Sequence, residues 1–395
     1  MDIRFRKAVS LFLAIASMFV FVSSCKQAPT AQPWERQKNE AMGIHPIPER
    51  NTSELDDIQN TTKQEDDQKI YDTRPASVSL EHIPVDKVKE NTPAHLKETL
   101  KMKGCTVSID ADILVRTREP QSCPIYRVEP FKYDPEMIAK LVYGEESDEA
   151  MAYDKTVEKA PERPNMHYFR SGNVHVVVDD HFMGMTNFFP RYTVVVEEEQ
   201  KDMKEIEVLP SGICDTISFS REEAIEKARA YLEPFKFPVD LDLPRVKACQ
   251  WHGFQYYEII FEHLYGGIPS YTNTLAANIP QLVLTFEYVS VQVCQEGVLS
   301  MGSFLSQKTG IEAEYRHVID FYTAYGLFKE YMYDRLAQAP MEEIFITEIE
   351  FAYFPVLPKD YDGSYWMMVP CWIFCYPSSN YSIVINGLDG SLIPV

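Results

Sequence analysis

The order of helical and extended patterns along the chain limits its possible folds more than any other property of the sequence. Residues 220–233 read SREEAIEKARAYLE, in which Ser220 and Glu223 have the spacing of a capping box ahead of a helix. Extended runs follow, and a second helix with further extended runs comes after them. The expected segments are strands at 256–265 and 281–293, a helix at 314–337, and strands at 344–356, 365–376 and 381–394. This order predicts an α+β fold built from repeated helix-plus-antiparallel-sheet units.

The N-terminus carries a different pattern. Arg4, Arg6 and Lys7 precede an apolar run over residues 8–22, and Ser23, Ser24 and Cys25 follow that run. The run is shorter than the roughly 20 residues that a membrane-spanning helix needs. Positive charge, a short apolar core and small residues are typical of a secretory signal peptide. Because a cysteine follows the small residues, as in a lipobox, we expect cleavage before Cys25 and attachment of lipid to its thiol. The alternative is an ordinary signal peptide with a chance cysteine.

Composition changes again after the cysteine. Residues 25–75 are rich in Pro, Gln, Asn, Thr, Asp and Glu and poor in large aliphatics, so they are expected to form a disordered, flexible tether. The residues after 75 are more numerous than a single hydrophobic core usually supports. The predicted domains are a signal peptide at 1–24, the lipidated cysteine and tether at 25–75, an N-terminal α+β domain at 76–215, and helix-plus-sheet units at 216–310 and 311–395.

The chain is strongly acidic. Its formal charge is −21, and removing residues 1–24, with three basic residues and Asp2, leaves −23 on the mature chain. Such a charge disfavours binding to nucleic acid and would be repelled by anionic lipid headgroups. We therefore expect contact with the membrane through the lipid on Cys25, and no nucleic-acid partner.

Two of the eight cysteines are close together in the sequence, at Cys371 and Cys375. They lie in the strand-like run WMMVPCWIFCYP. Four residues of strand separate two thiols on one face by ~13 Å, which is too far for a mutual disulfide. Unpaired cysteine is among the most buried residue types. A buried apolar role is therefore favoured over a metal or redox role.

One stretch combines imidazole and carboxylate side chains. It contains His175, Asp179, Asp180 and His181, which are residue types that bind zinc or manganese. These ligands would converge only if the end of the strand curled. The alternative is a set of surface residues on an edge strand that leads into a turn, and it is the expected one, so no metal or other cofactor is predicted.

Three glutamates suggest a second possibility. Glu258, Glu262 and, across a predicted hairpin, Glu287 could together form a carboxylate cluster for acid–base chemistry or calcium. Carboxylates on the polar face of a sheet are more often only solvated. No catalytic residue is therefore predicted.

The link between the strands at 256–265 and 281–293 is unusually long. It reads GGIPSYTNTLAANIP, whereas hairpin links usually have two to five residues. We expect Tyr271 and Asn273 at its tip, where they could contact a partner. In the competing interpretation the loop covers the sheet, with Ile268 and Pro269 filling the core.

Several motifs occur together in one order. They are VSIDADILV with PIYRVEPF, YYEIIFEHLYGGIPSYT, QEGVLSMGSF, and YWMMVPCWIFCYP with SIVINGLDGSLI. From about residue 105 to the end, the chain resembles a family of uncharacterised lipoproteins from clostridial-type Gram-positive bacteria, known as a domain of unknown function. Its C-terminal half also looks like PepSY-type domains. Cys371 and Cys375 depart from the usual ending of the family, and the resemblance implies no catalytic residues.

These features together predict a membrane-anchored extracytoplasmic lipoprotein. A non-enzymatic binding or regulatory protein is favoured, because PepSY-like resemblance implies such a role. Its partner would be an unidentified extracytoplasmic protein or ligand. The alternative is an extracytoplasmic hydrolase. It would depend either on a metal held by the residues at 175–181 or on the carboxylates of Glu258, Glu262 and Glu287.

Overall fold

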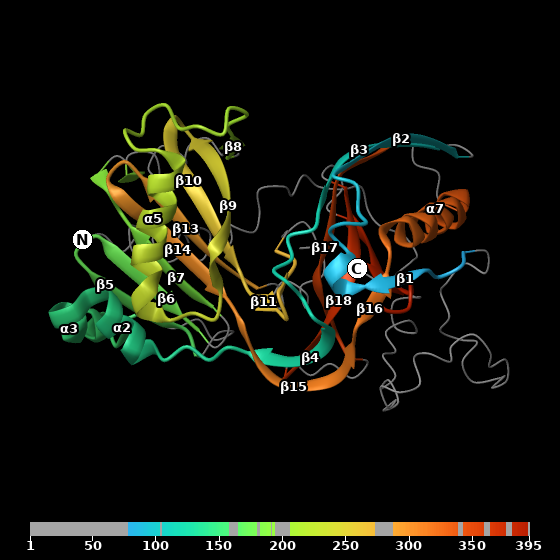
Figure 1. Cartoon of the computed structure of the whole chain (residues 1–395). Helices are drawn as coiled ribbons and strands as arrows, with labels where there is room; N and C mark the ends of the chain where they lie inside the picture. Colours follow the sequence, from blue (N-terminus) through green and yellow to red (C-terminus); the bar gives the residue numbers. More distant parts are fainter. Residues whose placement is uncertain are drawn as a thin grey trace. The chain divides into compact units, whose positions relative to one another are not determined.

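A computed structural model describes residues 78–102, 105–157, 165–179, 182–190, 192–193, 206–272, 287–338, 343–358, 364–376 and 381–393. The fold is mixed α+β, as predicted (Figure 1). The chain divides into two compact units. Among the described residues, unit 1 holds 130–263 and 287–307, and unit 2 holds 78–129, 264–272 and 308–393.

These units divide the chain differently from the contiguous domains predicted at 76–215, 216–310 and 311–395. Strands from the predicted N-terminal domain are shared between the two units. Residues 95–114 pair with strands near the C-terminus, while residues 167–187 join the sheet that follows residue 240. Pairing between strands distant in sequence decides the units, and local sequence patterns do not report such pairing.

Unit 1 is one eight-stranded antiparallel sheet with helices. The strand order is β5 (His167–Ser171), β6 (Val174–Val178), β7 (Met183–Asn187), β14 (Gly297–Phe304), β13 (Tyr288–Cys294), β10 (Phe254–Glu262), β9 (Asp240–Trp251) and β8 (Glu207–Val208). The helices are α2 (Pro135–Tyr143), α3 (Ser147–Asp154) and α5 (Arg221–Leu232), with short 3₁₀ turns at Gly144–Glu146 and Glu233–Phe235.

Helix α5 begins where the capping box predicts. The Ser220 side chain accepts a hydrogen bond from the Glu223 backbone N–H at 3.2 Å, and the Glu223 carboxylate accepts one from the Ser220 N–H at 2.7 Å. These two bonds satisfy donors that a helix start otherwise leaves exposed. The buried face of α5 carries Ala224, Ala228 and Leu232 and belongs to the same core as the central strands β10 and β13.

Unit 2 contains a second eight-stranded sheet. The strand order is β15 (Ser306–Tyr315), β4 (Cys123–Pro130), β18 (Trp366–Tyr376), β17 (Glu343–Val356), β3 (Cys105–Leu114) and β2 (His95–Met102), while β19 (Tyr381–Asn386) and β20 (Leu392–Ile393) extend it from β18. Two small ribbons pair β1 (His82–Pro84) with β16 (His317–Ile319) and β11 (Leu264–Tyr265) with β12 (Ile268–Pro269). The helices are a 3₁₀ turn at Val85–Lys87 and α7 (Phe321–Gln338). Strands β17 and β3 run parallel, so this sheet is mixed rather than wholly antiparallel.

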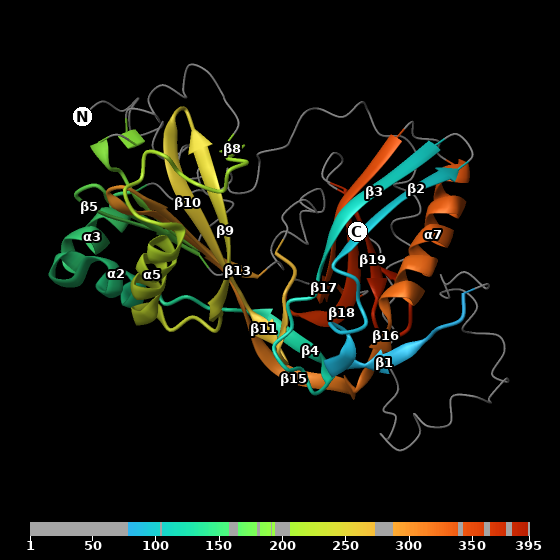
Figure 2. The ribbon, with the colours of Figure 1, turned by 45° about the horizontal axis from the view of Figure 1, so that its top comes forward.

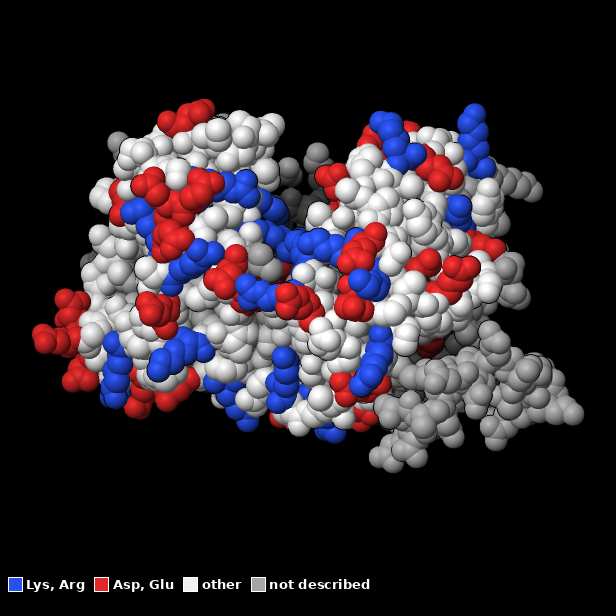
Figure 3. All heavy atoms as spheres, in the orientation of Figure 1, with Lys and Arg blue, Asp and Glu red and all other residues white. Residues whose placement is uncertain are grey.

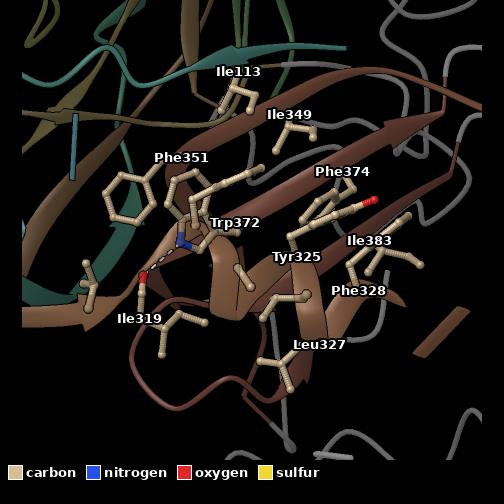
Figure 4. Packing of buried hydrophobic residues seen from close by; sticks show 14 of the residues in the cluster. Ile113, Ile319, Tyr325, Leu327, Phe328, Ile349, Phe351, Trp372, Phe374 and Ile383 are labelled. Carbon is tan, nitrogen blue, oxygen red and sulfur yellow. Dashed lines mark hydrogen bonds between the residues drawn. The ribbon is translucent and has the colours of Figure 1, made fainter. Parts of the chain in front are cut away.

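Helix α7 packs along one face of this sheet (Figure 2). Its residues Tyr325, Leu327 and Phe328 lie in one apolar cluster with side chains of the strands (Figure 4). The Phe328 and Phe374 rings stack with centroids 4.3 Å apart. Fully burying a side chain such as that of Phe328 stabilises a fold by ~1.5–3 kcal/mol, so this cluster contributes substantially to the stability of unit 2.

The predicted repeat of helix and strands is present in both units. After α5, the strands β9, β10, β13 and β14 are neighbours in chain order, and after α7 the strands β17, β18, β19 and β20 are neighbours in the same way. Each unit is therefore a helix followed by an antiparallel meander, to which earlier strands are added.

The second predicted helix starts later than expected. Within the predicted helix, residues 314–315 belong to β15 and residues 317–319 to β16, and α7 begins at Phe321. Asp320 supplies the cap, since its carboxylate accepts a hydrogen bond from the Thr323 N–H at 2.7 Å. Strand pairing to β4 overrides the modest helix propensity of IEAEY at 311–315.

Candidate functional site

The most polar part of the interior of unit 1 lies where β10 ends and β13 begins. Glu262 and His263 end the first segment, and Glu287 precedes the second. Arg245 on β9 contacts the Glu262 carboxylate at 2.8 Å, and His263 Nδ1 lies 2.9 Å from the Glu287 carboxylate. Glu262, His263 and Glu287 are all buried, with 5% exposure or less. Buried charges are tolerated when they are paired in this way.

A buried tyrosine extends this polar cluster. The hydroxyl groups of Tyr133 and Ser303 form a hydrogen bond of 2.7 Å. Burial raises the pKa of Tyr133 above its usual value, and the nearby Asp179 and Glu287 carboxylates raise it further. We define Tyr133, Arg245, Glu262, His263, Glu287 and Ser303 as the polar cluster of unit 1.

Glu258 has a different environment on the same strand. Its cross-strand neighbours are Lys247 on β9 and Gln292 on β13. Desolvation raises its carboxyl pKa, while Lys247 and a hydrogen bond from Ser290 lower it in part. Glu258, Glu262 and Glu287 therefore have separate partners. They do not form a shared carboxylate cluster, and only Glu258 is partly exposed, whereas Glu262 and Glu287 are buried rather than solvated as expected.

His175 is also in a different place from either prediction. Strand β6 lies between β5 and β7, so it is not an edge strand, and His175 is buried with its ring 4.6 Å from that of Phe188. Burial, and to a smaller extent Arg170, lowers the His175 pKa to about 4. Asp180 and His181 lie outside the described residues. The described residues contain no group of three or more His, Cys, Asp or Glu side chains placed to hold a metal ion.

Unit 2 has its own buried ion pair. Arg116, just after β3, forms a salt bridge with Glu350 of β17, whose side chain is fully buried. The carboxylates of Glu348 and Glu350 both raise the pKa of Cys375 on β18, although burial is the larger cause. The ion pair therefore lies close to this thiol.

Tyr271 lies in this same interior, which corrects the position predicted for it. The side chain is 0% exposed, and its hydroxyl group is 3.4 Å from Cys375 Sγ and 3.5 Å from Ser382 Oγ. Its backbone N–H donates to the Tyr353 carbonyl at 2.8 Å. An exposed tip was expected, whereas the residue packs beside β17. Asn273 lies outside the described residues.

A sharp reversal places Tyr271 there. Gly266 and Gly267 have φ values of +58° and +84°, and they join β11 to β12 in a tight hairpin. A Cβ atom on Gly267 would lie 2.2 Å from the Arg118 carbonyl oxygen, so the position requires glycine. The chain then returns towards the core, with Ile268 fully buried. This agrees with the competing interpretation, in which the start of the loop fills the core.

The cysteines of the strand-like C-terminal run are buried, as predicted. Cys371 and Cys375 are both unpaired and at most 2% exposed. Cys123, Cys214, Cys249 and Cys294 are likewise unpaired and buried. Burial raises the pKa of Cys375 to about 12 and that of Cys371 well above its usual value. These thiols therefore act as small apolar side chains.

Figure 3 shows how charged side chains are distributed on one face of the molecule. On the face shown in Figure 3, basic and acidic side chains are interspersed rather than gathered into one large patch of either sign. Among the helices in the described parts of the chain, none is long and apolar enough to cross a membrane.

Two residues of these buried ion pairs were not predicted from the sequence, Arg116 and Arg245. Both are the basic partners of buried glutamates. Arg116 directly follows the apolar run at 113–115, which is a weak signal for a buried charge, whereas Arg245 lies in the strand DLDLPRVKACQW among other charged residues and carries no such signal. Neither position identifies its partner.

Comparison with known proteins shows similarity in fold only. No family model and no curated protein matches the sequence. An uncharacterised protein from Eubacterium rectale has a similar structure over 77% of this chain and 94% of its own, with a TM-score of 0.52 and 12% identity. YycH from Bacillus subtilis aligns over 75% of this chain and 58% of its own, with a TM-score of 0.30 and 9% identity. The first similarity shows that the fold of this chain also occurs in another protein.

Proposed function

We propose that the chain is a lipoprotein, held on the outer face of a membrane by lipid on Cys25, and that its two units bind or regulate a partner rather than catalyse a reaction. The observation that carries the proposal is the N-terminal order of Arg4, Arg6 and Lys7, an apolar run, and Ser23-Ser24-Cys25. The resemblance to clostridial-type lipoproteins and to PepSY-type domains supports it.

The interior chemistry supports a non-catalytic role. Glu262, Glu287 and Glu350 each contact a basic side chain inside a unit. A general base must reach a substrate proton within hydrogen-bond distance, and these carboxylates are nearly or fully buried. Such pairs are suited to specifying one arrangement of strands, which leaves the exposed surface for recognition.

Lipidation can be tested by changing one sulfur atom. Cells that produce the Cys25→Ser variant of the full chain would be fed radiolabelled palmitate and then fractionated. The variant should carry no label and should leave the membrane fraction. Cys105→Ser is the matched control, because it removes a thiol from β3 and should keep both label and location. Continued labelling of Cys25→Ser would overturn lipidation at this site.

The binding role needs a separate test. Intact cells would be treated with a membrane-impermeant crosslinker, and the chain would then be purified under denaturing conditions. A specific extracytoplasmic protein or ligand should be recovered with the native chain. Its yield should fall for Cys25→Ser, which is released from the membrane. Recovery of no partner, together with turnover of a substrate by the purified body, would contradict the binding role.

A further inference from the structure

Strand β15 is an open edge of the large sheet in unit 2. Among the described strands, β15 has a neighbour on one side only, β4. Residues 307–312 are all exposed, whereas a strand that covers a core exposes only alternate residues. Both faces of β15 and its outer edge are therefore accessible over this stretch.

The inner side of β15 is well fixed. Lys308 Nζ donates to the Leu264 carbonyl at 3.1 Å and lies 4.7 Å from the centre of the Tyr265 ring. The Ser122 hydroxyl donates to the Glu314 carboxylate at 2.6 Å. These contacts hold the strand in an extended conformation, so its outer edge is preorganised for pairing.

An edge of this kind is a template for another strand. Proteins usually protect long edges with charges, proline or bulges. The middle of β15 instead carries Ile311, which is 61% exposed. An exposed β-branched residue at the centre of an open edge favours pairing with another apolar strand residue.

The sequence of β15 complements itself. If two copies pair antiparallel about Ile311, Ile311 lies opposite Ile311 and Thr309 lies opposite Ala313. Lys308 of each copy then lies opposite Glu314 of the other copy. By symmetry this contact occurs twice, and each time it brings opposite charges together. A register centred on Gly310 also places Lys308 opposite an acid, Glu312. Opposite charges facing each other across a pair stabilise it, and like charges destabilise it.

The other edge of the same sheet has the reverse property. Strand β2 reads HLKETLKM. Pairing two copies about Thr99 would place Lys97 opposite Lys101, and pairing about Glu98 would place that carboxylate opposite itself. Like charges therefore protect β2 against self-pairing near its centre, and β15 lacks this protection.

We infer that β15 is a homodimer interface, in which two copies of the chain pair their β15 strands antiparallel and join two sheets into one. The partner is a second copy because charge complementarity holds for β15 against itself. This inference does not depend on lipidation or on the identity of any other partner.

Engineered cysteines test the pairing directly. Residues that face each other across an antiparallel pair have Cα atoms ~4.5–5.5 Å apart, within the range for a disulfide. In the full chain, Ile311→Cys should give a disulfide-linked dimer on mild oxidation of intact cells with copper–phenanthroline, as seen on a non-reducing gel. In the same register residue 310 of one copy lies opposite residue 312 of the other. The double variant Gly310→Cys, Glu312→Cys should therefore also crosslink, and it tests the other of the two alternating types of cross-strand pair, hydrogen-bonded and non-hydrogen-bonded.

A matched control comes from the same strand. In the Ile311-centred pair the two copies of residue 309 lie ~13 Å apart, so Thr309→Cys should give little dimer. Ile311→Lys should lower the dimer fraction in sedimentation at least several-fold without changing the melting temperature, because the side chain is exposed. The proposal is overturned if neither Ile311→Cys nor the double variant forms a dimer, or if Thr309→Cys crosslinks equally well. It is also overturned if Ile311→Cys crosslinks to a different protein in place of a second copy.

Discussion

The indole N–H of Trp372 donates a hydrogen bond to the backbone carbonyl of Ile319 at 3.1 Å, which joins β18 to β16 beside the first turn of α7 (Figure 4). The Ile319 N–H in turn donates to the Gly387 carbonyl at 2.7 Å, and the Gly387 N–H donates to the Pro370 carbonyl at 2.8 Å. Three segments distant in sequence are therefore joined by consecutive hydrogen bonds inside the core of unit 2.

We expect Trp372→Phe to destabilise unit 2 by ~1–3 kcal/mol, because the Ile319 carbonyl loses its buried partner. The aromatic ring is retained, so the loss of packing should be smaller than for alanine. Urea unfolding followed by circular dichroism would measure the change. Tyr322→Ala on the exposed side of α7 is the control and should cost less than ~0.5 kcal/mol. Equal effects of the two changes would contradict a structural role for the hydrogen bond.

Removal of one member of the Arg116–Glu350 pair should be costly. Glu350 is fully buried, so Arg116→Met leaves a carboxylate without its cation, and we expect a loss of ~3–5 kcal/mol. The double variant Arg116→Met, Glu350→Leu removes both charges and should recover most of that stability. Thermal unfolding of the single and double variants would give the interaction free energy between Arg116 and Glu350. An additive double variant would mean that the two side chains do not act as a pair.

The six buried thiols should resist alkylation. Burial raises the pKa of Cys214 to about 11 and that of Cys375 to about 12, so little reactive thiolate is present at pH 8. Iodoacetamide followed by peptide mass spectrometry should therefore modify these cysteines only after unfolding in guanidinium. Thr309→Cys on the exposed strand β15 serves as the positive control and should react within minutes. Rapid labelling of Cys371 or Cys375 in the folded chain would argue against their burial.

Local signals were sufficient to predict much of the fold. The capping box at Ser220 and Glu223 acts within one turn of helix, and it is present. The strands predicted at 344–356 and 365–376 correspond to β17 and β18. In each of these cases the residues that decide the structure are close together in the sequence.

Pairing between distant residues could not be predicted in the same way. Nothing near Arg116 indicates Glu350, which is 234 residues away, and nothing near Tyr271 indicates that it packs beside Tyr353. The predicted exposure of Tyr271 assumed one long loop from residue 266, whereas Gly266 and Gly267 make a tight turn that returns the chain to β17. Long-range packing therefore decided the outcome where local patterns were ambiguous.

His175 should make the stability of unit 1 depend on pH in a defined interval. In the folded state the His175 imidazole is favoured in its neutral form, because burial against Phe188 lowers its pKa from 6.5 to about 4. Between pH 6.5 and 4 the unfolded chain therefore binds more protons at this residue than the folded chain. Stability from His175 is fully present above pH 6.5 and falls as the pH is lowered towards 4, by ~3 kcal/mol at most.

His175→Phe isolates this contribution, because phenylalanine retains the ring and removes the titrating group. We expect the variant to lose less stability than the native chain when the pH is lowered from 7.5 to 4.5, in urea unfolding at both values. The exposed His317 provides the control, and His317→Phe should keep the native response to acid. If His175→Phe and the native chain lose stability equally over this interval, the low pKa of the buried imidazole is contradicted, and the acid sensitivity of unit 1 must come from its carboxylates.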